Sequence, residues 1–123
     1  MTETDEIVRQ KNALLCMSEP LTFTKRMFAD VYRRSFVVGE HHKIICEALK
    51  DVMNGECTRL MINIAPRYSK TELVSRSFIA AGFALNPASN FIHLSYSRDL
   101  VRANSQGVRD ILSCRYYQYL YGN

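Results

Sequence analysis

Residues 60–75 read LMINIAPRYSKTELVS, and this stretch decides the predicted fold. Its first part, residues 60–64, is a short apolar run that is typical of a buried parallel strand. Pro66 cannot continue a central strand, because proline has no N–H group to donate to a neighbouring strand. After Lys70 the apolar residues recur at helical spacing, at Leu73, Val74, Phe78 and Ala81. The stretch therefore predicts a strand, a tight turn and a helix that begins with Lys-Thr.

This order of elements is typical of a phosphate-binding loop. In such a loop the helix N-terminus holds the phosphates with backbone N–H groups, the lysine adds a positive charge and the threonine hydroxyl reaches Mg²⁺. The usual spacing would place glycines where this chain has Ile64 and Ser69. Ser69 is small, but unlike glycine it meets a steric cost at positive φ. A buried strand joined to an amphipathic helix that merely begins with Lys70-Thr71 is the alternative.

The neighbouring segments fit a parallel α/β unit. Apolar residues at helical spacing predict helices over residues 4–16, 40–54 and 98–113, and a further helix that starts at Pro20. Residues 91–94 form a second short apolar run, which predicts a second strand. The order strand, helix, strand, helix indicates a parallel sheet with right-handed crossovers. The predicted fold class is α/β: a P-loop NTPase-like parallel sheet with flanking helices, incomplete, preceded by N-terminal helices.

The predicted fold leaves apolar surface exposed in two places. Two strands alone cannot cover the edges of a parallel sheet, and residues 115–122 contain four tyrosines and a leucine that resemble a sticky tail. Exposed apolar surface of this kind favours association between molecules. The sequence therefore predicts that the chain self-associates.

The loop also carries a family resemblance. Residues 65–72, Ala-Pro-Arg-Tyr-Ser-Lys-Thr-Glu, resemble the variant Walker A loop of the large terminase subunit of tailed bacteriophages, which in one branch reads roughly Pro-Pro-Arg-x-x-Lys-[Ser/Thr]-Glu. The His-led helix start at residues 41–49 and the Ser-Tyr-Ser sequence at residues 95–97 are similar in order and spacing. The resemblance implies that residues 39–123 are the front part of a P-loop ATPase domain, truncated before Walker B. Residues 1–38 are then an N-terminal helical segment.

The resemblance implies the ATP-binding part of a viral or prophage DNA-packaging motor, which translocates double-stranded DNA into a procapsid. ATP and Mg²⁺ are the implied cofactors. Double-stranded DNA, the small terminase subunit, the portal protein and further copies of the chain in a homo-oligomer are the implied partners, in the bacterial host cytoplasm. No apolar run here ends in the acidic pair that hydrolysis needs, so we expect this chain alone to be inactive as an ATPase. The alternative is a non-catalytic prophage remnant that serves as a DNA-binding or assembly module.

The resemblance also assigns roles to individual residues. The ATP-binding residues would be Pro66, Arg67, Tyr68, Ser69, Lys70, Thr71 and Glu72, with His42 near the base. Lys70 would bind the β- and γ-phosphates, Thr71 would bind Mg²⁺, and Arg67 would be the catalytic arginine. The positive end of the helix dipole repels a lysine at a helix N-terminus, so a lysine in this position favours an anionic ligand. The plainer alternatives are a solvated lysine, an ordinary first-turn threonine, an arginine paired with a surface carboxylate and a polar helix start at His42.

Length and composition limit the classes of protein to which this chain can belong. The chain has 123 residues, of which 47% are hydrophobic and 23% are charged, as in a soluble domain or part of one. No run of ~18 apolar residues exists, so no membrane span is expected, and the polar, acidic N-terminus is unlike a secretory signal. The four cysteines are too widely spaced for a metal site. The net charge of +4 permits nucleic-acid binding without requiring it.

Overall fold

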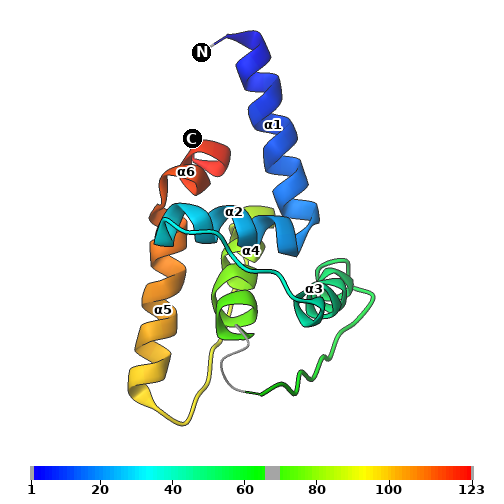
Figure 1. The fold of residues 1–123 in the computed structure, drawn as a ribbon. Helices are drawn as coiled ribbons and strands as arrows, with labels where there is room; N and C mark the ends of the chain where they lie inside the picture. The colour runs from blue at the N-terminus through cyan, green and yellow to red at the C-terminus, as the bar shows by residue number, and fades with distance from the viewer. Residues whose placement is uncertain (1, 66–69, 123) are drawn as a thin grey trace.

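The computed structural model describes residues 2–65 and 70–122, and helices account for most of this part of the chain (Figure 1). In chain order the elements are α1 (Glu3–Ser18), α2 (Pro20–Tyr32), α3 (Glu40–Met53), the π-helix η1 (Thr71–Ser77), α4 (Phe78–Leu85), α5 (Arg98–Ser113) and α6 (Arg115–Tyr121). Helix α4 continues directly from η1, so the two form one rod. In Figure 1 this rod and α5 run side by side, while α2 crosses over them and α1 projects from the body.

The predicted α/β fold with a parallel sheet is wrong, because the described residues contain no strand. Residues 60–64 and 91–94, the two predicted strands, are extended but have no backbone hydrogen bond to another described segment. Each packs against a different helix: Ile62 and Ile64 contact the cluster around α3, and the ring of Phe91 lies 4.9 Å from that of Phe83 in α4. Extended backbone becomes a sheet only when a second strand supplies donors and acceptors, and neither run supplies them to the other.

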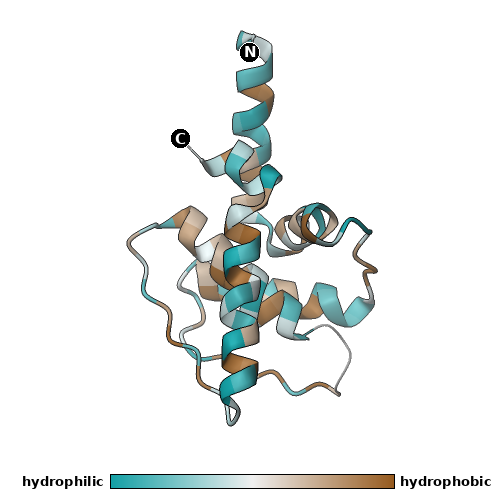
Figure 2. Ribbon diagram, turned by 90° about the vertical axis from the view of Figure 1, so that its left-hand side faces the viewer, coloured by the Kyte–Doolittle hydropathy of each residue, from teal (hydrophilic) through white to brown (hydrophobic). Residues whose placement is uncertain are grey.

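The helices begin and end largely where local signals place them. Pro20 occupies the first turn of α2, where its missing N–H group is not needed. Helix α3 ends at Met53, and Gly55 follows with a φ of 79°, a conformation that glycine adopts without a steric cost. Helix α4 ends at Leu85, before the Asn-Pro pair that disfavours further helix. Hydrophobic and hydrophilic residues alternate around the helices (Figure 2), as expected for helices with one buried face.

The main hydrophobic core lies between α1, α2, α4, α5 and α6. Its buried members are Cys16, Phe23, Met27, Ala80, Ala81, Ile111, Tyr117 and Leu120. The rings of Phe23 and Tyr117 meet edge to face with their centroids 6.1 Å apart, and the Tyr117 hydroxyl donates a hydrogen bond to the Ala80 carbonyl at 3.2 Å. The expectation that residues 115–122 form a sticky tail was wrong for Tyr117 and Leu120, because α6 folds back onto the core.

A second buried cluster fixes the start of η1 beside α3. It consists of Ile45, Cys46, Leu49 and Leu73. Leu73, in the first turn of η1, is only 1% exposed. This contact holds the residues that follow Lys70 against α3, so the position of the helix start depends on buried apolar side chains.

Candidate functional site

Half of the predicted phosphate-binding loop falls on residues that the structure does not describe. The roles predicted for Pro66, Arg67, Tyr68 and Ser69 lie outside the described residues. The structure describes the other four predicted site residues, which are Lys70, Thr71, Glu72 and His42.

Lys70 and Thr71 lie at the N-terminal end of the rod formed by η1 and α4. Lys70 has helical backbone angles, with φ −59° and ψ −44°, and both side chains are exposed. The first N–H groups of a helix have no acceptor within the helix, and the helix dipole makes this end positive. A cation, a hydroxyl and a helix N-terminus are therefore adjacent on an accessible surface.

Residues 71–77, near the start of this rod, are π-helical rather than α-helical. The N–H group of Phe78 donates to the carbonyl of Leu73, five residues earlier, which is the hydrogen-bond pattern of a π-helix. Such segments are rare and are frequent at functional sites. The spacing of apolar residues predicted an ordinary helix here, because this spacing does not distinguish an α-helix from a π-helix.

Glu72 is turned into the protein. Its side chain is 12% exposed, and its Oε2 accepts hydrogen bonds from the Tyr32 hydroxyl at 3.0 Å and from Nη1 of Arg76 at 3.3 Å. Its other oxygen, Oε1, is buried without a hydrogen-bond partner among the described residues. The carboxylate is thus held toward α2 and the following turn of η1, although the prediction placed Glu72 with Lys70 and Thr71 at the nucleotide.

Arg76 connects this carboxylate to two further elements. Its Nη1 donates to the Tyr32 hydroxyl at 3.0 Å, and its Nε donates to Oδ1 of Asn104 in α5 at 3.3 Å. The side-chain nitrogen of Asn104 lies 3.2 Å from Nε2 of His93. We call these five side chains, Tyr32, Glu72, His93, Asn104 and Arg76, the Arg76 network.

The Arg76 network was not predicted from the sequence. The spacing of Glu72 and Arg76, four residues apart on a helix, is a signal that could have indicated their ion pair. Burial, followed by the nearby Glu72 carboxylate, raises the pKa of Tyr32 above its ordinary value. The Tyr32 hydroxyl therefore keeps its proton at neutral pH and donates a hydrogen bond to Glu72.

His42 lies inside α3, away from an open surface. It is 4% exposed, its Nδ1 accepts a hydrogen bond from the N–H group of Gly39 at 2.8 Å, and its ring centroid lies 4.9 Å from that of Phe36. These contacts give His42 a role in starting α3 and packing it against the preceding connector. The predicted contact with a nucleotide base stays a prediction.

A cavity of about 390 Å³ borders the Arg76 network between the η1–α4 rod, residues 91–93 and α5. It is mainly apolar, and its lining residues include Ile79, Phe83, Phe91, Val108, His93 and Asn104. Among the residues that the structure describes, including those around this cavity, no three His, Cys, Asp or Glu side chains are close enough together to hold a metal ion. None of the described helices is long and apolar enough to cross a membrane.

Comparisons with protein-family models, with curated proteins and with solved structures found no match for this chain. The resemblance to the large terminase subunit consequently depends on the sequence motifs alone.

Proposed function

We propose that this chain binds the phosphates of Mg·ATP at the N-terminal end of η1, as the ATP-binding part of a phage-type DNA-packaging motor in the bacterial host cytoplasm. The observation that carries the proposal is the exposure of Lys70 and Thr71 at a helix N-terminus, within the motif that resembles the terminase loop. The proposal does not need a sheet, because helix N-termini hold phosphates with their own N–H groups.

The residues at this helix start fit an anionic, Mg²⁺-bearing ligand. The Lys70 ammonium would pair with phosphate oxygens, and the Thr71 hydroxyl is an oxygen ligand of the kind that Mg²⁺ accepts. The Glu72 carboxylate, which would repel phosphate, is engaged by Tyr32 and Arg76 instead. Bound Mg²⁺ would neutralise part of the phosphate charge. Arg67, by the family resemblance, is proposed to stabilise the charge that develops during phosphoryl transfer.

The partners proposed with this function are those of a packaging motor: double-stranded DNA, a small terminase subunit, a portal protein and further copies of the chain. The net charge of +4 is compatible with a polyanionic partner.

Titration calorimetry with Mg·ATP tests the proposal. Loss of one charged hydrogen bond to phosphate costs roughly 1.5–3 kcal/mol, so Lys70→Ala should bind about ten- to a hundredfold more weakly than the wild type. Lys25→Ala is the matched control, because Lys25 is an exposed lysine in the middle of α2. Equal affinities in the wild type and Lys70→Ala would remove Lys70 from the site. A wild-type chain that binds DNA but no Mg·ATP would favour the non-catalytic assembly module.

A further inference from the structure

We infer that the cavity beside the Arg76 network is a second binding site, which takes a small, mainly apolar molecule with one carboxylate. The cavity has a volume of about 390 Å³ and lies between the η1–α4 rod, residues 91–93 and α5. Its described lining residues begin at Ser75, so none of them belongs to the loop motif at residues 65–72. The inference is therefore independent of the proposed phosphate site.

The volume and the walls of the cavity set the size and character of the ligand. Ligand sites in proteins commonly have volumes of roughly 300–1,000 Å³, and a cavity of ~150 Å³ already holds one benzene ring. This cavity therefore has room for about two fused rings. Its apolar wall includes Ile79, Phe83, Phe91, Val108 and Leu112. The rings of Phe83 and Phe91 meet edge to face with their centroids 4.9 Å apart, an aromatic surface that suits a flat apolar body.

A chain of hydrogen bonds fixes the polar character of the inner lining. Asn104 is 9% exposed, and its Oδ1 accepts a hydrogen bond from Nε of Arg76 at 3.3 Å. The amide is thereby oriented so that its Nδ2, which can only donate, lies 3.2 Å from Nε2 of His93. Nε2 of His93 must then accept, so the ring proton is on Nδ1. Both acceptor atoms of this pair have a donor within the protein, and the His93 ring offers a donor to a ligand.

Arg109 gives the mouth of the cavity a positive charge. It lines the cavity from α5 with an exposed side chain, and its Nη2 donates to Oγ of Ser105, one turn earlier, at 3.3 Å. None of the described lining residues is an aspartate or a glutamate. Within the described chain no carboxylate forms an ion pair with Arg109 either. The charge at the cavity mouth is therefore not neutralised by the part of the protein that the structure describes.

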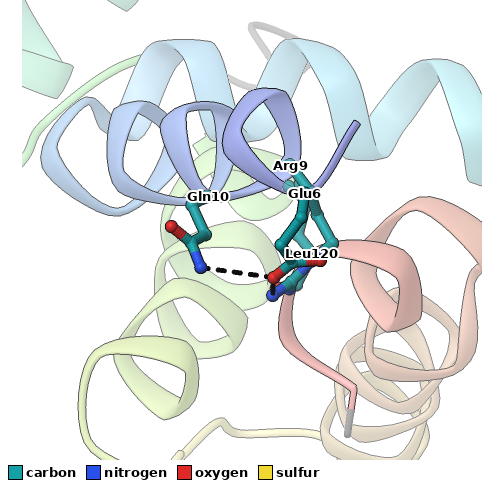
Figure 3. Close-up of polar contacts among 4 residues, drawn as sticks. All are labelled: Glu6, Arg9, Gln10 and Leu120. Carbon is teal, nitrogen blue, oxygen red and sulfur yellow. Dashed lines mark hydrogen bonds and ion pairs between the residues drawn. The ribbon is translucent and has the colours of Figure 1, made fainter. Parts of the chain in front are cut away.

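Arg9 in α1 shows the contrasting case. Its guanidinium pairs with Glu6 and donates to the Leu120 carbonyl at 2.9 Å, so acceptors within the chain engage it (Figure 3). The guanidinium of Arg109 instead contacts a neutral hydroxyl. Arginine has a planar fork of donors that binds a carboxylate through two parallel hydrogen bonds. A carboxylate is therefore the head group that complements the charge of Arg109.

The test uses naphthalene-2-carboxylate as the probe and naphthalene-2-carboxamide as its neutral counterpart of nearly the same size. Each is titrated into the full chain while the backbone amide signals are followed by NMR. We expect a dissociation constant of about 1 mM or lower for the carboxylate, about fivefold tighter than for the carboxamide. The largest signal shifts should fall at Ile79, Phe83 and Val108. A wild-type chain that binds neither probe, or shifts that gather elsewhere, would overturn the inference.

Arg109→Gln tests the head group. It should weaken binding of the carboxylate about fivefold and leave the affinity for the carboxamide unchanged, because only the charged hydrogen bonds are lost. Arg102→Gln is the matched control, since Arg102 is an exposed arginine of the same helix that is not among the lining residues. Equal affinities for the two probes in the wild type, or an equal loss in Arg102→Gln, would overturn the inference.

Val108→Trp tests the location, because the larger side chain would occupy part of the cavity. Both probes should bind at least about tenfold more weakly to this variant, and an unchanged affinity would overturn the inference. If the variant does not fold, the comparison of Arg109→Gln with Arg102→Gln still decides, because both side chains are exposed. A wild-type chain that binds naphthalene-2-carboxylate but not Mg·ATP would keep this inference and refute the proposed function. The reverse result would keep the proposed function and refute this inference.

Discussion

Apolar side chains are buried in the helical core but largely exposed in the segment at residues 91–96. Phe23 and Met27 in the core are 0% exposed, whereas Ile92, Leu94 and Tyr96 are 87%, 85% and 96% exposed. The core side chains belong to helices, whose backbone hydrogen bonds are satisfied within each helix. Residues 91–95 form an extended run that ends in a bend at Tyr96, and no backbone hydrogen bond joins residues 91–96 to another segment of the described chain.

The alternation along this segment explains the difference. In an extended chain successive side chains point to opposite sides. Phe91 packs on Phe83, and His93 lies beside Asn104. Ile92 and Leu94, the residues that follow each of them, point away from the helices and are exposed. One helical layer can cover only one face of an extended segment. A helix, by contrast, can direct its whole apolar stripe toward the core.

The largest expected effect comes from the core side of this comparison. Phe23→Ala should lower the free energy of unfolding by about 3–5 kcal/mol, because it removes a fully buried ring and leaves a cavity beside Tyr117. Urea denaturation followed by circular dichroism measures this loss. Leu14→Ala in α1, where the side chain is 67% exposed, should change stability by less than about 0.5 kcal/mol. Similar losses in both variants would show that the core is elsewhere.

A smaller effect is expected from the buried polar contact in the same core. Tyr117→Phe removes the hydrogen bond from the Tyr117 hydroxyl to the Ala80 carbonyl and should cost about 1 kcal/mol in the same denaturation assay. Tyr119→Phe is the control, since Tyr119 is 41% exposed on the same helix. Equal stabilities of the wild type and Tyr117→Phe would mean that the Tyr117 hydroxyl contributes no stability through this bond.

Alkaline pH should also weaken the core. Burial raises the pKa of Tyr117 to about 12 and that of Cys46 to about 11, so both groups stay protonated in the folded chain at pH values where the unfolded chain has lost these protons. The folded state then binds more protons than the unfolded state, and stability falls as pH rises. The contribution of Tyr117 is complete below pH ~10 and is lost as pH rises toward its folded pKa. Denaturation midpoints measured from pH 8 to 12 should fall less steeply in Tyr117→Phe than in Tyr119→Phe.

The sequence predicted the parts of the fold that depend on local signals. Predicted helices at residues 40–54 and 98–113 agree with α3 and α5, since the residues that stop or cap a helix are its immediate neighbours. The two predicted strands were wrong because a strand requires a partner, and an apolar run does not show whether a partner exists. Helix α6 was missed because its tyrosines were interpreted as surface, although Tyr117 is 7% exposed.

In the candidate site too, the sequence predicted the features that depend on local signals and missed those that depend on tertiary contacts. The start of a helix after Lys70 followed from the spacing of Leu73, Val74 and Phe78. The Arg76 network did not, because Tyr32 and Asn104 are 40 and 28 residues from the η1 side chains they bond. Neither residue has a neighbour in the sequence that points to such a contact. The direction of the Glu72 side chain therefore depends on tertiary contacts with Tyr32 and Arg76, which the local sequence does not predict.

The smallest expected effect on stability comes from the exposed face of residues 91–96. Replacing Ile92 and Leu94 together by serine should change the free energy of unfolding by less than about 0.5 kcal/mol, because both side chains are already in solvent.

The same double substitution should reduce self-association, since these side chains form an apolar strip beside backbone groups that a second molecule could pair with. Size-exclusion chromatography with light scattering measures this. Val37→Ser is the control, because Val37 is an apolar residue outside this segment that is 83% exposed. A wild-type chain that stays monomeric over a wide concentration range would contradict the predicted self-association, and a marked loss of stability in the double variant would show that the segment is packed like the core.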